Sequence, residues 1–172
     1  LLRLTIPMKT ANVTGVSSLK SPKHKAMTIL NYINGQLVAP VGGQYLPNMN
    51  PAIGDVYSTL PDSDSNDVRL AVESAQQAFS TWSSMPIPKR TAILLRIADL
   101  IDRDLNSLAE AESIDQGKPL KLAKAVDIPR ASANMRFYAM AAENFASESH
   151  LMEGEAINYT TRTPLGVAGC IS

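Results

Sequence analysis

The sequence predicts an α/β protein, and three observations lead to that prediction. Apolar residues recur at helical spacing in two long segments, residues 68–82 and 94–108. Strand-forming residues flank an Asn-Gly pair at residues 34–35. Small apolar residues at 167–171 follow a Pro-Leu-Gly turn, a pattern that is typical of a buried strand in a parallel sheet. Strands at both ends and helices between them indicate a mixed architecture.

The first expected elements are short strands separated by turns. Residues 32–38 predict a hairpin of two strands around the Asn-Gly turn. The sequence NPAIGD at residues 50–55 predicts a second turn, and a short strand follows near residues 56–60. Gly42, Gly43 and Pro47 interrupt the pattern between these elements.

Two helices are expected next. Residues 62–67, DSDSND, supply side chains that cap a helix, and an apolar stripe of helical period begins just after them. A second helix begins after Pro88, continues or restarts near Asn106, and ends at Gly117 in a left-handed cap.

A further helix begins near Pro119 and contains Pro129. Because proline lacks a backbone donor and clashes with the preceding turn, we expect a kink or break around residues 127–128. Polar and apolar residues then alternate over 154–161, which predicts a strand that leads to Pro164 and the final buried strand.

Composition excludes several classes of protein. The chain has 172 residues, 45% of them hydrophobic, and a formal net charge of zero, as in an ordinary globular protein. Neither sign of charge dominates, so we expect no nucleic acid and no anionic membrane as partner. No apolar run approaches the roughly 20 residues that span a bilayer. The single cysteine excludes an intramolecular disulfide and suits a reducing compartment.

The first 26 residues differ from the rest. They contain lysines, an arginine and many hydroxyl side chains but no acidic residue. This composition fits a transit peptide, and it equally fits an untranslated leader with Met27 as the true start. We therefore expect a cytoplasmic protein, or a mitochondrial one if the leader is a transit peptide.

Several motifs in order along residues 32–172 resemble the N-terminal third of an NAD(P)-dependent aldehyde dehydrogenase. The resemblance is carried by ING at 33–35, NPAIGDV at 50–56, DQGKP at 115–119 and RTPLGVAGCIS at 162–172. A narrower similarity, to the branch that oxidises 2-aminomuconate and 2-hydroxymuconate semialdehydes, lies in DIPRA at 127–131, NMRFYA at 134–139 and NYTTR at 158–162. The resemblance implies a small aldehyde as substrate, NAD as cofactor with NADP as the alternative, and a homodimer or homotetramer.

The resemblance also implies a division of the chain. The expected parts are a leader at 1–28, the N-terminal helical part of the NAD-binding domain at 29–152, one strand of an oligomerisation ribbon at 153–164, and the first strand of a Rossmann-like sheet at 165–172. Such a strand needs parallel neighbours joined by crossover helices, and none follow it in the sequence. We therefore expect the front part of a larger enzyme with an incomplete fold.

No catalytic residue is assigned. The family oxidises its substrate through a thiohemiacetal on a cysteine and a thioester that a glutamate-activated water hydrolyses. The single thiol, Cys170, lies in the apolar run, where burial would make it an inert structural residue. We expect this chain alone to be inactive. The alternative is a non-catalytic truncated subunit that pairs its ribbon strand with full-length partners.

Two binding sites follow from the resemblance. Ile171 and Ser172 would lie near the cofactor, because ligands of open α/β sheets bind at the carboxyl ends of parallel strands. Asp127, with the backbone carbonyls of Asn48 and Met49, would hold a monovalent cation, which prefers oxygen ligands. The alternative is that Asp127 is a surface or capping carboxylate ahead of Pro129.

A calcium-binding module is the remaining alternative. Asp62, Asp64, Asn66 and Glu73 match four ligand positions of a calcium loop. The loop also needs a glycine where this chain has Asp67, and helix capping explains the same residues.

Overall fold

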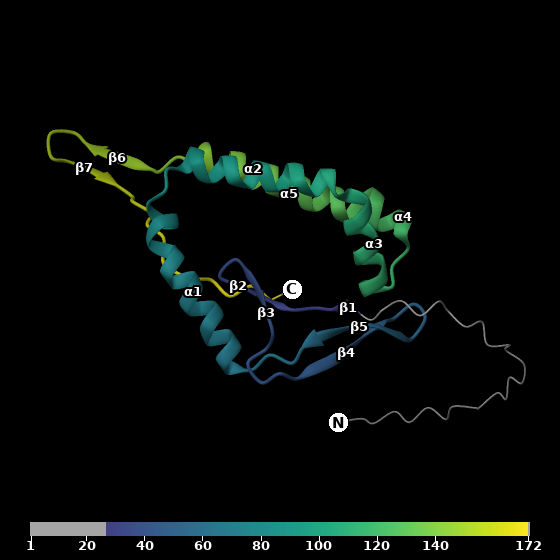
Figure 1. Cartoon of the computed structure of the whole chain (residues 1–172). Helices are drawn as coiled ribbons and strands as arrows, with labels where there is room; N and C mark the ends of the chain where they lie inside the picture. Colours follow the sequence, from purple (N-terminus) through teal and green to yellow (C-terminus); the bar gives the residue numbers. More distant parts are fainter. Residues whose placement is uncertain (1–26, 172) are drawn as a thin grey trace, which may run out of the picture.

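The computed structural model describes residues 27–171, in which strands come first, helices follow, and a two-stranded ribbon projects from the helices (Figure 1). Residues 1–26 of the leader expected over 1–28, and the expected cofactor residue Ser172, lie outside the described residues.

The N-terminal part of the described chain, residues 27–61, contains a three-stranded sheet. Its order is β1 (Met27–Thr28), β5 (Asp55–Pro61) and β4 (Tyr45–Asn50), with β1 parallel and β4 antiparallel to the central strand β5. The expected turn and the strand after it are confirmed. Strand β4 was not predicted because it contains Pro47, which an edge strand tolerates. Residues 27–28, assigned with the leader, instead form β1.

The hairpin of β2 (Asn31–Ile33) and β3 (Gln36–Val38) is confirmed. Asn34 and Gly35 have φ angles of 52° and 75°. Two consecutive positive φ angles define the tight turn whose twist matches that of paired strands, and asparagine and glycine are the residues that adopt it most readily.

Helix α1 (Ser65–Ser84) begins with a capping box. Asp64 accepts hydrogen bonds from the backbone N–H of Asn66 at 2.7 Å and of Asp67 at 3.3 Å, and Asp67 accepts one from the N–H of Asp64 at 3.0 Å. Glu73 lies roughly 13 Å from Asp64 along the helix axis. Its side chain pairs with Arg69 at 3.0 Å. The acidic cluster is therefore a helix cap, and the geometry contradicts a calcium loop.

Helices α2 (Ile87–Arg103) and α5 (Ile128–Glu143) pack along each other (Figure 1). Ala98 and Ala139 are fully buried there, because small side chains let the helices approach closely. Arg136 of α5 also binds two carboxylates of α2, Asp99 at 2.8 Å and Asp102 at 2.7 Å.

None of the helices within residues 27–171 combines the length and apolar character that a membrane crossing requires.

A kink or break was expected near residues 127–128, and the structure has a widened helical turn there without a break in the helical path. Helix α3 (Leu105–Gln116) ends at Gly117, and a single turn α4 (Leu120–Leu122) runs into the π-helical turn η1 (Ala123–Asp127) before α5 begins. Asp127 and Ile128 keep helical backbone angles, so α5 continues the helical path, and Pro129, which has no N–H to donate, directly follows the widened turn. The wider π turn is how the chain passes the proline without ending the helical path.

The ribbon differs from the expected single strand over 153–164. It starts earlier and has two antiparallel strands, β6 (Ser149–Met152) and β7 (Ala156–Tyr159). Strand β6 was missed because its sequence, SHLM, has two polar residues followed by two apolar ones and so does not alternate.

The strand expected over 165–172 is not formed in the described part of the chain. Residues 160–171 have no regular structure, and the side chains of Leu165 and Ile171 are fully exposed. Cys170 is exposed too, so its expected burial is wrong for this structure. A parallel strand forms only when its N–H and C=O groups bond to neighbouring strands, and within residues 27–171 no strand pairs with this segment.

Candidate functional site

The site residues predicted from the sequence belong to two regions of the structure. One region is at the end of α3, and the other is the C-terminal segment beside α1. We call the first region the α3 corner. It consists of Asn48, Pro51, Tyr57, Glu112, Asp115, Gly117, Lys118 and Asp127.

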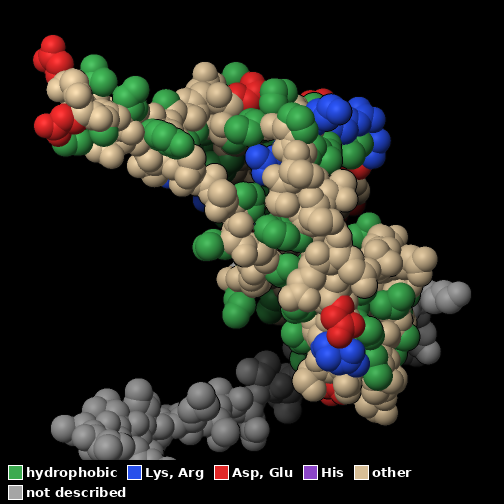
Figure 2. All heavy atoms as spheres, turned by 90° about the vertical axis from the view of Figure 1, so that its left-hand side faces the viewer, with side chains coloured by type: hydrophobic (Ala, Val, Ile, Leu, Met, Phe, Trp, Pro, Cys, Tyr) green, Lys and Arg blue, Asp and Glu red, His purple; other side chains and the backbone are tan. Residues whose placement is uncertain are grey.

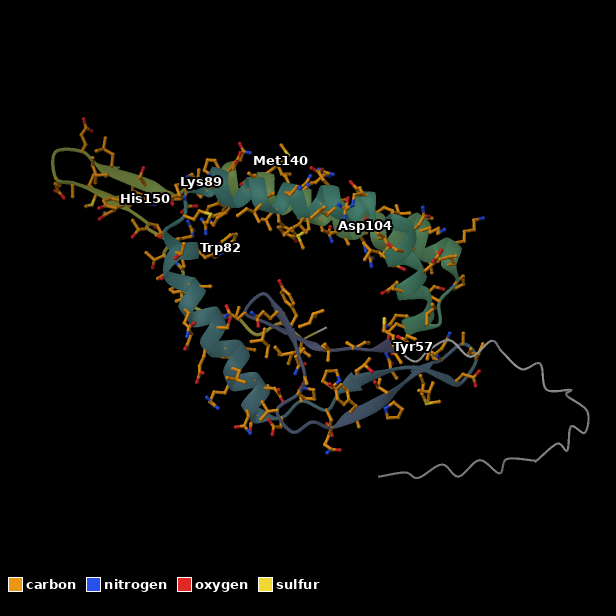
Figure 3. The ribbon with its side chains drawn as sticks, viewed as in Figure 1. Tyr57, Trp82, Lys89, Asp104, Met140 and His150 are labelled. Carbon is orange, nitrogen blue, oxygen red and sulfur yellow. The ribbon has the colours of Figure 1, made fainter. Side chains whose placement is uncertain are left out.

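A hydrogen-bonded cluster joins the sheet to α3. The Tyr57 hydroxyl donates to Oδ1 of Asp115 at 2.6 Å, and the Asn48 amide donates to both groups, at 2.9 Å and 3.2 Å. Figure 3 shows Tyr57 between the strands and the end of α3. The hydrogen bonds from Tyr57 and Asn48 lower the pKa of Asp115. Desolvation and then the bond to Asp115 raise the pKa of Tyr57, so the pair is a neutral phenol and a carboxylate.

The turn between β4 and β5 packs against the C-terminal cap of α3. Gly117 has a φ of 68°, and a Cβ placed there would lie 2.9 Å from Cγ of Pro51 and 3.1 Å from the backbone N of Ala52. Two of the quoted motifs, at residues 50–56 and 115–119, therefore meet at this contact. Glycine is required both by the left-handed backbone and by the lack of space.

Lys118 connects α3 with the π turn. Its ammonium lies 2.6 Å from Oε1 of Glu112 and 2.9 Å from Oδ2 of Asp127. These hydrogen bonds, the one to Glu112 first, raise the pKa of Lys118. The second carboxylate oxygen of Asp127 faces Arg130 at 3.6 Å.

The residues predicted to hold a cation gather at the same helix but through different partners. Asn48 and Met49 flank a register shift between β4 and β5, and the side chain of Asn48 binds Asp115. Asp127 reaches the helix through Lys118 and Glu112. Residues 27–171 contain no group of three or more histidine, cysteine or acidic side chains that could hold a metal ion. The cation site stays a prediction, and Asp127 already has cationic partners.

Of the two predicted cofactor residues, Ile171 is described and belongs to the second region. Residues 165–169 run beside Ala71, Val72 and Ala75 of α1, where the two segments line a shallow pocket. Ile171 extends beyond it into solvent. Within residues 165–171 only backbone groups and one exposed thiol are available to a ligand, so these residues do not by themselves form a cradle for a dinucleotide.

Sequence reasoning missed the bonding role of Tyr57, Glu112, Asp115 and Lys118. The motif at residues 115–119 was recognised as a family motif and as the end of a helix, but no contact of its side chains was predicted. Tyr57 was recognised only as part of a strand. The contact between Tyr57 and Asp115 joins residues 58 positions apart, and local spacing contains no signal for it.

Comparisons with known proteins agree with the resemblance. Residues 38–172 match the aldehyde dehydrogenase family. The chain is 40% identical over 154 residues to the 2-aminomuconic semialdehyde dehydrogenase of Mus musculus, a match that covers 87% of this chain and 31% of the relative. It is 38% identical over 149 residues to the 2-hydroxymuconic semialdehyde dehydrogenase of Pseudomonas sp. (strain CF600), covering 84% of this chain and 31% of that protein. The chain therefore spans less than a third of the length of these relatives.

Solved structures share the fold as well. HpcC from Thermus thermophilus superposes with a TM-score of 0.77 at 31% identity, over 80% of this chain and 27% of that one. The P. syringae indole-3-acetaldehyde dehydrogenase AldA, in complex with NAD+ and IAA, superposes with a TM-score of 0.74 at 29% identity, over 78% of this chain and 28% of that one. With the family match over most of its length, this chain belongs to the aldehyde dehydrogenase family.

Proposed function

We propose that the protein to which these residues belong oxidises a muconate semialdehyde to the corresponding carboxylate, with NAD as the hydride acceptor. The observation that carries the proposal is the 40% identity to a 2-aminomuconic semialdehyde dehydrogenase over 87% of this chain. The similarity to a 2-hydroxymuconic semialdehyde dehydrogenase supports the same substrate class. NAD is supported by the related structures that contain it, AldA among them.

In this proposal the described residues build a scaffold for the cofactor domain. The α3 corner fixes the N-terminal sheet against the helices through Tyr57, Asp115 and Gly117. Residues 165–169 lie beside α1 without regular structure, and in this proposal their backbone groups would pair with further strands. Ile171 and Ser172, at the end of that segment, would lie near the cofactor once the sheet is complete. NAD when bound would accept the hydride, and the residues described here would position the strand.

The test is an assay of the product of the longest open reading frame that contains these residues. We expect it to reduce NAD with 2-aminomuconate or 2-hydroxymuconate semialdehyde at a kcat/KM well above that for indole-3-acetaldehyde. Parallel assays with NADP determine the cofactor preference. A higher kcat/KM with the indole aldehyde would refute the proposed substrate class.

We also propose that the 172 residues alone have no dehydrogenase activity. A catalytic thiol needs a polar environment that lowers its pKa. The single cysteine, Cys170, is exposed on a segment without regular structure. The purified chain should leave NAD unchanged in the presence of either semialdehyde. Activity that is present in this chain and absent in Cys170→Ser would contradict the proposal.

A second function, as a non-catalytic subunit, is favoured by the ribbon. The cross-strand partners Leu151 and Ile157 share one face with Tyr159, and their exposed fractions are 75%, 65% and 72%. Figure 2 shows hydrophobic side chains on this projecting ribbon, with acidic side chains at its tip. An exposed apolar strand pair of this kind is suited to pairing with a second subunit.

Co-expression distinguishes this second function from the first. A tagged chain of the same 172 residues should capture a full-length relative such as the 2-aminomuconic semialdehyde dehydrogenase, and Leu151→Glu with Ile157→Glu should abolish the capture. The control is Glu153→Gln at the tip, which leaves the apolar face intact. Equal capture by both variants would show that the ribbon does not form the contact.

A further inference from the structure

The turn of the β2–β3 hairpin is formed by Asn34 and Gly35, the single Asn-Gly pair in the sequence. Both residues are exposed, and their φ angles are 52° and 75°. The hairpin has three residue pairs, and the pair next to the turn is Ile33 with Gln36. A two-stranded hairpin is marginally stable by itself, so opening of this turn costs little free energy.

An asparagine that precedes glycine reacts with the following peptide bond. The backbone nitrogen of Gly35 loses its proton and forms a bond to Cγ of Asn34, while the Cγ–Nδ2 bond breaks and ammonia leaves. Glycine favours this step because it has no side chain to hinder the approach of its nitrogen. Water then opens the cyclic succinimide that results. Opening at Cγ gives aspartate, and opening at the backbone carbonyl gives isoaspartate, so the net reaction consumes only water.

We propose that Asn34 is a site of spontaneous deamidation and that isoaspartate at this position separates the hairpin from α1. Aspartate preserves the turn, since Asp-Gly also adopts it readily. In isoaspartate the main chain passes through the side chain and gains a methylene group, and a two-residue turn with this longer backbone no longer closes the same register. This inference does not depend on the proposed dehydrogenase activity.

Hydrogen bonds connect the hairpin to the start of α1. The Asn31 amide donates to Oγ of Ser63 at 2.9 Å and to Oδ1 of Asp67 at 3.3 Å. The backbone N–H of Val41, in the loop after β3, donates to the same oxygen of Asp67 at 3.0 Å. Asp67 is only 4% exposed. Because a buried carboxylate that loses its donors is costly, damage to the turn should lower the stability of the N-terminal region.

The first experiment follows the reaction in the unaltered chain of 172 residues at neutral and mildly alkaline pH. Peptide mapping by mass spectrometry detects the exchange of NH2 for OH, and a synthetic peptide of residues 29–41 gives the rate without a fold. We expect modification of Asn34 at a rate within about tenfold of that in the peptide, and a faster rate at the higher pH, because the attacking nitrogen must be deprotonated. Asn144 and Asn158 are exposed too but precede aromatic residues, and they should stay unmodified. An Asn34 that remains intact while the peptide is converted would overturn the proposal.

Two variants test the chemistry separately from the fold. Asn34→Gly removes the reacting amide and keeps a pair, Gly-Gly, that forms the same turn, so the mass change should disappear. Gly35→Ala places a methyl group beside the attacking nitrogen and should slow the reaction. Its rate is measured in urea as well as in buffer, so that an effect on folding does not enter. A rate in urea equal to that of the unaltered chain would refute the assigned reaction.

The last experiment tests the effect on the hairpin. Methyl transfer from S-adenosylmethionine by a protein isoaspartate methyltransferase measures the isoaspartate in the incubated chain. Its thermal midpoint, followed by circular dichroism, should fall by roughly 2 to 4 °C as isoaspartate accumulates. The matched control is Asn34→Asp, which introduces the charge on an ordinary backbone and should lose less. Equal midpoints for the incubated chain and Asn34→Asp would show that isoaspartate does not separate the hairpin from α1.

Discussion

Asp67 is a buried carboxylate whose partners are all neutral. Only 4% of the residue is exposed, and it accepts hydrogen bonds from the amide of Asn31 at 3.3 Å and from the backbone N–H of Val41 and Asp64, both at 3.0 Å. These bonds tie the hairpin and the loop after it to the start of α1.

Truncation of Asp67 should therefore be costly. Asp67→Ala leaves two backbone donors without a partner, and we expect the free energy of unfolding to fall by about 3 kcal/mol. Asp67→Asn keeps one acceptor and should lose less. The exposed residue Asp62, as Asp62→Asn, is the control. Urea unfolding measures all three variants, and a loss for Asp67→Ala no larger than for Asp62→Asn would contradict this role.

Asp115 should make the stability of the chain depend on pH. Hydrogen bonds from Tyr57 and Asn48 lower its pKa in the folded state below the value of about 3.9 for an unfolded chain. Its contribution is thus fully present above about pH 4 and is lost as the pH falls through the lowered folded-state pKa.

The Tyr57 hydroxyl is the group to remove in testing this dependence. Tyr57→Phe should reduce the free energy of unfolding by about 1 kcal/mol at neutral pH and flatten its decrease in acid. Tyr45→Phe, on the neighbouring strand β4, serves as the control. The measurement is urea unfolding at a series of acidic pH values. An acid slope that is the same in both variants would show that the Tyr57–Asp115 bond contributes nothing to it.

At the scale of the elements, the cap of α3 is the most constrained contact. Gly117 combines a positive φ with a close approach to Pro51, whereas Gly43 has a φ of 64° and open space around it, and Gly42 has neither constraint. Three alanine substitutions therefore separate strain from crowding.

Gly117→Ala should destabilise the chain by about 2 kcal/mol or more, since the strained backbone and the contact with Pro51 both contribute. Gly43→Ala should lose about 1 kcal/mol from the backbone alone, and Gly42→Ala should change little. Differential scanning calorimetry gives the order. Equal effects of Gly117→Ala and Gly43→Ala would show that the turn between β4 and β5 moves away from the added methyl group with no loss of stability.

At the scale of the whole molecule, apolar surface is the dominant property. Large apolar side chains are exposed on every part of the described chain: the hairpin, α1, α5, the ribbon and the C-terminal segment. They include Tyr32, Leu37, Val68, Phe137, Met140, Phe145, Leu151, Ile157 and Leu165. Surface of this extent on a protein normally marks contact with other protein.

The isolated chain should consequently bind a hydrophobic dye and self-associate. Dye fluorescence and light scattering measure the two effects, and both should rise with protein concentration. The full-length relative of the co-expression test should lower the dye signal, because it would cover part of the apolar surface to which the dye binds. A monomer that binds no dye and unfolds cooperatively would contradict this prediction.

Local features were determined by the sequence itself. The Asn34–Gly35 turn, the capping residues before α1, the glycine after α3 and the irregular helical turn before Pro129 each depend on contacts within a few residues. The α/β class followed from these elements, and the family followed from motifs that are read in order along the chain.

Tertiary structure decided what depends on distant segments. Only the fold brings Tyr57 to Asp115, places Lys118 between Glu112 and Asp127, and pairs β1 with β5. It also left residues 165–171 without the strand that their composition predicts. A strand and an ion pair both need partners that the rest of the chain has to supply, and a local pattern specifies only one side of each such contact.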